Sequence, residues 1–333
     1  MAHASAAAHP VLLTLTGLLA GGIILALGQG DFPIPPGQVA ALLWTPAPDQ
    51  AASDVIWSIR LPRIAAAVLT GASLAAAGAA YQTLFRNPLA SPALLGVSAG
   101  AGFGAALAML AQASALMVQS AAFTGGLVAV TLALALSARL GRGSILILIL
   151  SGLVISALFQ AFTSGLKYLA DPLDTLPAIV FWLLGSLARA TAPDLAVAAP
   201  PALLGLTVLM LLRWPTQVIE AGDDEARTLG VRVGLVRILV IGAATLATAA
   251  AVSVAGIIGW VGLLVPHLAR LLVGTAYPLL LPTSILLGAL FLVAVDTLCR
   301  TAFAIELPLG IVTAVLGAPL FVVILLRARR TWS

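Results

Sequence analysis

The sequence carries very little charge. Only 8% of its 333 residues are Asp, Glu, Lys or Arg, whereas 61% are hydrophobic and the mean hydropathy is +1.14. A soluble domain of this size does not need so apolar a core, and no stretch between the apolar segments is long enough to fold in water. The composition therefore predicts an integral membrane protein with a single domain over residues 1–333.

Lysine is nearly absent, because Lys167 is the only one and it follows Leu166. A phosphate-binding loop of the form GxxxxGK[ST] is therefore excluded, so the chain cannot itself be the usual nucleotide-hydrolysing motor. No expected span holds several carboxylates near its middle, and Asp296 and Glu306 fall near helix ends. This pattern disfavours the alternative of an ion-coupled secondary carrier.

Few side chains suit catalysis or metal binding. Cys299 is the only cysteine, which excludes an intramolecular disulfide and a cysteine-based metal cluster. His3 and His9 lie in an N-terminal tail, and His267 has no second ligand near it in sequence. We expect His267 to make a structural hydrogen bond rather than to bind metal or haem. We expect no catalytic residue, metal or cofactor in this chain, and no nucleic-acid partner.

The apolar segments predict an all-α, polytopic membrane helix bundle. Most approach the ~20 residues that a helix needs to cross the hydrocarbon core, and the alternation typical of a membrane β-barrel is absent. About ten spans are expected, at 11–28, 61–84, 93–111, 117–138, 145–166, 195–213, 235–255, 259–273, 280–299 and 307–326. The seventh and eighth are separated at Gly256 and Gly259. The stretch from Pro177 to Leu187 is too short to cross, and predicts an outer half helix that lines a pore.

The basic residues predict the orientation. An even number of spans places both termini on one side, and a cytoplasmic N-terminus puts eleven basic residues inside: Arg86, Arg139, Arg142, Arg213, Arg227, Arg232, Arg237, Arg270, Arg327, Arg329 and Arg330. The remaining five lie outside, at Arg60, Arg63, Lys167, Arg189 and Arg300. This excess of basic residues is the bias expected of a cytoplasmic side. The outward arginines at the mouths of spans, Arg60, Arg63 and Arg300, therefore need a reason to be there.

The longest charged stretch on the predicted inner side covers residues 220–237. Acidic residues at 223–225 favour a helix start, residues 226–229 continue the helix, and Gly230 is placed as a glycine cap. We expect a short helix, a turn and a second short helix across the inner surface, within a loop of about residues 214–234. Such a compact element with oriented charge suits docking of a cytoplasmic partner, and a solvated loop is the simpler alternative.

Six motifs in chain order resemble a known family. They are RLPR at 60–63, FRNPLASPALLGVSAGAG at 85–102, GDDEARTLGV at 222–231, GWVGLLVPHLARLL at 259–272, DTLCR at 296–300 and ELPLGIVTAVLGAPLF at 306–321. Together they resemble the FecCD-type permeases, which are membrane subunits of binding-protein-dependent ABC importers for iron-siderophores, haem, vitamin B12 and related compounds. The similarity extends from about residue 11 to residue 330.

The resemblance implies a set of partners. The chain would lie in the bacterial plasma membrane as a multi-pass protein, surrounded by membrane lipid and paired with a second copy of itself. The path would follow the dimer axis. Two cytoplasmic subunits would bind ATP and Mg, and a soluble outer substrate-binding protein, called the receptor below, would dock from outside.

The resemblance also assigns roles to individual residues. Arginines at the outer mouth would meet acidic residues on the receptor's lobes, and these are Arg60, Arg63 and Arg300; helix-end snorkelling is their alternative role. The inner helix would couple the chain to the ATP-binding subunits through Asp224, Glu225, Ala226, Arg227, Leu229 and Gly230, with Ala226, Leu229 and Gly230 as its packing core. The inner gate would use Asn87 and Leu89 of the NPLASP turn. A second gate loop near Gly143 and Ser144 has an open register, and Ser144 is its candidate.

The substrate is not determined by these motifs. A path lined by Ala, Gly, Ser and Leu would make few specific contacts with a bulky chelate and would leave selection to the receptor. We rank a ferric siderophore first and haem second. Cobalamin and molybdate are the alternatives within the same importer class.

Overall fold

The computed structural model describes residues 2–44, 50–141, 144–302 and 305–329. Within these ranges every regular element is a helix, which confirms the predicted all-α class. The α-helices are α1 (Ala2–Gly28), α2 (Pro36–Trp44), α3 (Gln50–Asp54), α4 (Leu61–Leu84), α5 (Val97–Leu110), α6 (Ala115–Leu140), α7 (Ile145–Leu169), α8 (Thr175–Leu183), α9 (Ala192–Leu211), α10 (Arg213–Ala221), α11 (Asp223–Thr228), α12 (Val233–Ala255), α13 (Val261–Val273), α14 (Tyr277–Thr301) and α15 (Leu309–Arg329). A π-helical segment, η1 (Val55–Arg60), runs into α4, and a 3-10 turn, η2 (Pro92–Leu95), precedes α5.

Seven helices in the described chain are long and apolar enough to cross a membrane: Pro10–Gly28, Ala51–Leu84, Ala115–Leu140, Ile145–Leu169, Ala192–Leu211, Val233–Ala255 and Tyr277–Thr301. Three shorter apolar helices, Val97–Leu110, Val261–Val273 and Leu309–Ile324, coincide with the other predicted spans. With 13 residues, α13 is only about 20 Å long, short of the ~30 Å hydrocarbon core. Length thus supports a polytopic helical membrane protein, with seven segments that qualify as full spans.

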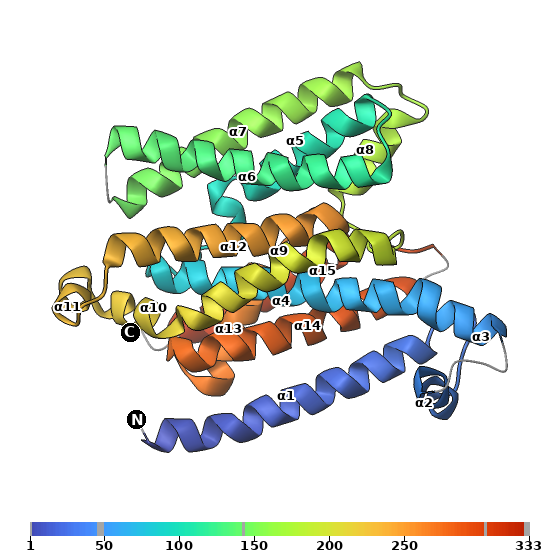
Figure 1. Cartoon of the computed structure of the whole chain (residues 1–333), viewed down its shortest axis with the longest axis horizontal. Coiled ribbons are helices and arrows are strands. Elements are labelled where there is room, and N and C mark those ends of the chain that lie inside the picture. The colour runs from blue at the N-terminus through green and yellow to red at the C-terminus, as the bar shows by residue number, and fades with distance from the viewer. Residues whose placement is uncertain (1, 45–49, 142–143, 303–304, 330–333) are drawn as a thin grey trace.

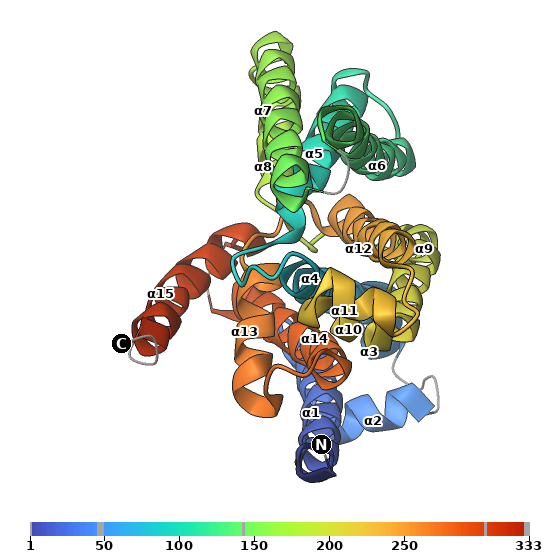
Figure 2. The same cartoon turned by 90° about the vertical axis from the view of Figure 1, so that its left-hand side faces the viewer.

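The helices form two groups that lie side by side. In Figure 1, α5, α6, α7 and α8 make one group, and α4, α9, α12, α13 and α14 make the other, with α1 along its far side. Figure 2 shows that α15 leans away from the second group. Helix α4 occupies the centre of that group, since most of its side chains are buried.

Small residues allow close packing around α4. A Cβ on Gly71 would lie 2.1 Å from the backbone oxygen of Gly288 in α14, and one on Gly78 would lie 1.8 Å from the backbone oxygen of Gly262 in α13. Helices in membranes associate through such small residues, because lipid tails remove the hydrophobic drive for large ones to pair. The glycine and alanine content of α4 therefore explains how it packs against several helices at once.

The bundle has two distinct ends. Helices α10 and α11, the start of α1 and the end of α15 lie at one end, called the α11 end, whereas α2, α3 and α8 lie at the other, called the α8 end (Figure 1). The predicted half helix at 177–187 is present as α8, which has nine residues and starts at Thr175. The prediction of a second short helix after the Gly230 turn was wrong. The chain passes directly into α12 at Val233, and the other short helix, α10, precedes α11.

Candidate functional site

The three predicted docking arginines lie at the α8 end, and two of them, Arg63 and Arg300, lie beside one buried carboxylate, that of Asp296. Arg63 Nε lies 3.0 and 3.1 Å from the two Asp296 carboxylate oxygens, and Arg63 Nη2 lies 2.8 Å from Asp296 Oδ1. Arg63 Nη2 also pairs with Glu306, and Arg300 Nε is 3.8 Å from Asp296 Oδ2. The Asp296 side chain is 1% exposed, whereas that of Glu306 is 35% exposed. The Arg63–Asp296 pair is therefore internal, and Glu306 is its accessible neighbour.

Arg60 and Arg300 are engaged with the end of α1. Arg60 donates from Nη1 to the Leu27 oxygen and from Nη2 to the Phe32 oxygen, both at 2.6 Å. Arg300 donates from Nη1 to the Gln29 oxygen at 2.6 Å, and from Nη2 to that of Ala26. The last carbonyls of a helix have no partner within it, so these guanidiniums supply missing donors. Arg60 and the Arg300 side chain are only 6% and 9% exposed.

Sequence reasoning missed this internal role. The motifs placed the arginines at the mouth of the bundle, with acidic residues of a receptor as their expected partners. Asp296 lies in the same motif as Arg300, and Glu306 lies in the motif that contains the start of α15. The closeness of these acidic residues to Arg300 was the signal in the sequence for pairing within the chain. A partner's carboxylate would therefore have to compete with carboxylates and backbone oxygens of this chain.

The α11 end holds a cluster of ion pairs centred on Asp223, the first residue of α11. Arg86 Nη2 lies 3.2 Å from Asp223 Oδ1, and Arg237 Nη2 lies 3.1 and 3.2 Å from its two carboxylate oxygens. Arg86 also donates to the backbone oxygen of Ile219 in α10, at 2.8 Å. Asp223 thereby connects α11 both to the end of α4 and to α12. Asp223 was expected among the acidic residues that start this helix, but not among the coupling residues, which began at Asp224.

The side chains of α11 and of Leu229, the residue directly after it, divide into an inner and an outer face. Ala226 is fully buried against this chain's own core, so it fastens α11 to the bundle and is not free for a partner. Leu229 is 62% exposed. Asp224 and Glu225 are also exposed, and the Asp224 carboxylate pairs with Arg227 at 2.7 Å within the same helix.

Gly230 ends this element as predicted. Its φ is +80°, and the Val231 N–H donates to the Ala226 oxygen at 2.9 Å, which closes the turn after the helix. Glycine takes this left-handed conformation without the Cβ clash of other residues.

The predicted gate turn at Asn87 begins directly after Arg86, which belongs to the ion-pair cluster at Asp223. Arg86 has a φ of +48°, an uncommon conformation for a residue with a side chain, and it sits immediately before Asn87. Asn87 Oδ1 accepts the Leu89 N–H at 2.9 Å, and the Leu89 side chain is 52% exposed. The Asn87 turn is therefore ordered locally and attached through Arg86 to α11.

The remaining predicted residues lie at the same end. Ser144 caps α7 by accepting the Ile147 N–H at 3.4 Å, and Gly143 lies outside the described residues. His267 Nδ1 lies 2.7 Å from the Leu263 oxygen, the structural contact expected of it.

The described residues contain no group of His, Cys, Asp and Glu that could hold a metal ion. Burial raises the pKa of the Glu220 carboxyl, and neighbouring Arg270 and Arg86 oppose that shift.

The lengths of the apolar helices define a polytopic helical membrane protein, with a short charged helix, α11, at one end of the bundle. The model of the FecCD transport family matches residues 18–327, so the chain belongs to that family of ABC importer permeases. This confirms the resemblance predicted from the motifs.

Similar proteins carry different cargo names. The chain is 37% identical over 324 residues to the molybdate import system permease protein MolB of Haemophilus influenzae, with 96% of each chain covered. It is 43% identical over 277 residues to a probable iron chelatin transport system permease protein of Helicobacter pylori (strain 26695), with 83% of this chain and 84% of the relative covered. A metal-chelate type ABC transporter solved in an inward-facing conformation has a TM-score of 0.88 and 37% identity, covering 96% and 99% of the two chains. Family membership is therefore established, and the cargo is not.

Proposed function

We propose that two copies of this chain form the membrane path of an importer for an iron chelate, driven by two cytoplasmic ATP-binding subunits and supplied by an outer receptor. The observation that carries the proposal is α11, which exposes Leu229 and is tied through Asp223 to α4 and α12. A short, braced element with an exposed apolar side chain suits transmission of movement from a docked partner. The direct test is co-purification with an ATP-binding subunit and ATP-dependent uptake in proteoliposomes.

The proposed orientation places the α11 end in the cytoplasm. The α11 end carries Arg86, Arg139, Arg213, Arg227, Arg232, Arg237 and Arg270, and the α8 end carries Arg60, Arg63, Lys167, Arg189 and Arg300. Excess arginine marks the cytoplasmic side of membrane proteins. Both termini then lie inside, at the plasma membrane.

Single-cysteine labelling tests this orientation. Cys299 is buried, so a Cys299→Ala background leaves no native thiol. We expect a membrane-impermeant maleimide to label Tyr168→Cys in intact spheroplasts, because Tyr168 is 90% exposed at the α8 end. Thr228→Cys in α11 should react only after permeabilisation. Labelling in the reverse pattern would invert the orientation and with it the assignment of the docking surfaces.

Coupling is proposed to run from α11 through Asp223 and Arg86 to the gate turn at Asn87. We expect Asp223→Asn to retain the ATP-binding subunits but to lower transport per ATP hydrolysed about two- to five-fold, since partly exposed ion pairs contribute up to about 1 kcal/mol each. The measurement is uptake and phosphate release in the same proteoliposomes. Asp54→Asn, the same change at the α8 end, is the control. An unaltered ratio in Asp223→Asn would remove Asp223 from the coupling route.

The cargo is proposed from the motif resemblance together with the iron chelatin name of the Helicobacter pylori relative. A ferric siderophore stands first and haem second, and cobalamin and molybdate remain alternatives of the same class. Uptake of the four labelled compounds in a strain lacking the gene, and in its complement, tests the ranking. Complemented loss of molybdate uptake alone would overturn the iron assignment while retaining the importer.

A further inference from the structure

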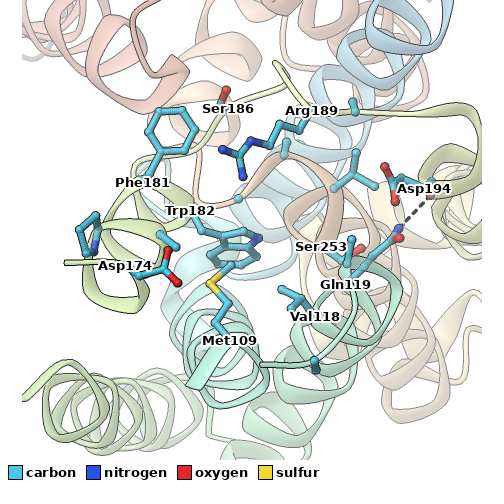
Figure 3. A pocket seen from close by; sticks show the side chains of 18 of the residues that line it. Met109, Val118, Gln119, Asp174, Phe181, Trp182, Ser186, Arg189, Asp194 and Ser253 are labelled. Atoms are coloured by element: carbon cyan, nitrogen blue, oxygen red, sulfur yellow. Dashed lines mark hydrogen bonds between the residues drawn. The ribbon is translucent and has the colours of Figure 1, made fainter. Parts of the chain in front are cut away.

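A cavity of about 690 Å³ lies at the α8 end, where the two helix groups meet. Its walls come from α8, from the ends of α5 and α12, and from the starts of α6 and α9 (Figure 3). Cavities of roughly 300–1,000 Å³ are of the size that holds small organic ligands. Nothing in the proposed roles of the arginine cluster or of α11 uses this space.

One wall of the cavity is apolar and aromatic. Phe181 and Trp182 of α8 line it, together with Met109 and Val118. Backbone contacts fix the position of α8, because the Ser186 N–H donates to the Ala255 oxygen at 2.9 Å. Gly256 has a φ of +68°, and a Cβ there would lie 2.3 Å from the Trp182 oxygen. The aromatic wall is therefore held in place by α12.

Unpaired donors face the same space. Figure 3 shows the Arg189 guanidinium extending into the cavity, toward the side on which Phe181 and Trp182 lie. Arg189 is exposed and makes no ion pair or hydrogen bond with any residue that the structure describes, and the Trp182 indole N–H is likewise unpaired there. This contrasts with Arg60, Arg63 and Arg300, each of which donates at least two hydrogen bonds within the chain. Arg189 is thus the guanidinium at this end that is available to a ligand.

The acidic and amide groups of the cavity restrict what can bind. Asp194 is occupied as a helix cap, since its Oδ2 accepts from Thr191 N at 3.0 Å and from Thr191 Oγ1 at 2.6 Å. Gln119 donates to the Asp194 backbone oxygen at 2.8 Å, and its own Oε1 is buried with no partner among the described residues. Asp174 is exposed and lines another part of the wall. The cavity therefore offers a guanidinium, an aromatic surface and the buried acceptor Gln119 Oε1. The Asp174 carboxylate repels anions from the part of the wall that it lines.

We propose that this cavity binds an organic anion bearing an aromatic or conjugated ring, and that such an anion is the imported cargo. The second part rests on the proposed import function. Arg189 would pair with a carboxylate or phenolate, the ring would pack against Phe181 and Trp182, and Gln119 Oε1 would accept a ligand O–H or N–H. Molybdate lacks the ring, and cobalamin has a conjugated ring but no net negative charge. The cavity favours an anionic aromatic chelate over both.

Equilibrium dialysis tests the site, with the assembled permease and ATP-binding subunits in nanodiscs and no receptor. The probes are a ferric tris-catecholate, which has rings and negative charge, molybdate, which has charge alone, and cobalamin. We expect the tris-catecholate to bind most tightly and Arg189→Gln to weaken it at least about ten-fold, since charge-assisted hydrogen bonds contribute on that scale. Trp182→Leu should weaken it as well. Lys167→Gln, a charge removal elsewhere at the α8 end, should leave binding unchanged.

Two results would overturn the site: equal affinity in wild type and Arg189→Gln, or molybdate or cobalamin binding as tightly as the tris-catecholate. Retained ATP-binding subunits show that each variant is folded. Uptake separates the two levels of the proposal. If the wild type binds the chelate at Arg189 but never imports it with ATP and receptor, the import function fails and the site stands. If the wild type imports it and Arg189→Gln binds and imports it equally well, the site fails and the import function stands.

Discussion

Replacing Leu229 with aspartate is expected to abolish recovery of the ATP-binding subunit with the permease. Leu229 is 62% exposed next to Gly230, so its side chain is the apolar surface that α11 offers to a partner. Burying a new carboxylate in an apolar cleft leaves it without water or a counter-ion. Loss of a central interface anchor costs about 2–4 kcal/mol, which weakens the dissociation constant about 30- to 1,000-fold. The measurement is the yield of ATP-binding subunit after affinity purification.

The control is the same substitution at the other end of the bundle. Leu173 is 91% exposed at the α8 end, so Leu173→Asp adds an equal charge on a surface that does not face the ATP-binding subunit in the proposed orientation. Its recovery of ATP-binding subunit should equal that of the wild type. Full recovery in Leu229→Asp, with ATP-dependent uptake intact, would exclude α11 as the docking element.

Most of the helical architecture could be predicted from the sequence, because apolar segment length and glycine placement act locally. The ten expected spans each coincide with an apolar helix, and the turn after α11 closes at Gly230. The number of full crossings could not be predicted in this way. A 13-residue helix such as α13 is too short to cross the membrane alone and packs against α4 and α14, and this tertiary context is not visible in a hydropathy window.

The candidate site was predicted less completely, because side-chain partners depend on distant segments. Arg63 and Asp296 are separated by 233 positions, so their pairing leaves little trace in local sequence. Ala226 follows three acidic residues and looked available to a partner, but the packing of α11 on α10 and α12 buries it. The sequence predicted which residues lie at each end of the bundle. It did not predict whether each side chain is free or already paired within the chain.

Arg63→Gln is expected to destabilise the permease by about 3–5 kcal/mol, because it leaves the buried Asp296 carboxylate without its main partner. A lower melting temperature in detergent would report this loss. Adding Asp296→Asn should recover part of it, since the double variant no longer buries that unpaired charge. Arg63→Glu is expected to reduce receptor docking and uptake, but it places a third carboxylate beside Asp296 and Glu306, so it cannot separate docking from folding.

Glu306→Gln separates the effect on receptor docking from the effect on folding. Its side chain is 35% exposed, so removing its charge should change stability by no more than about 1 kcal/mol. If Arg63 meets a receptor carboxylate, loss of the competing Glu306 charge should tighten receptor binding about two- to five-fold, most visibly at low salt. Surface plasmon resonance with the immobilised permease complex gives both affinity and salt dependence. Equal affinity in wild type and Glu306→Gln, at low and high salt, would leave Arg63 as a brace between α4 and α14 with no part in docking.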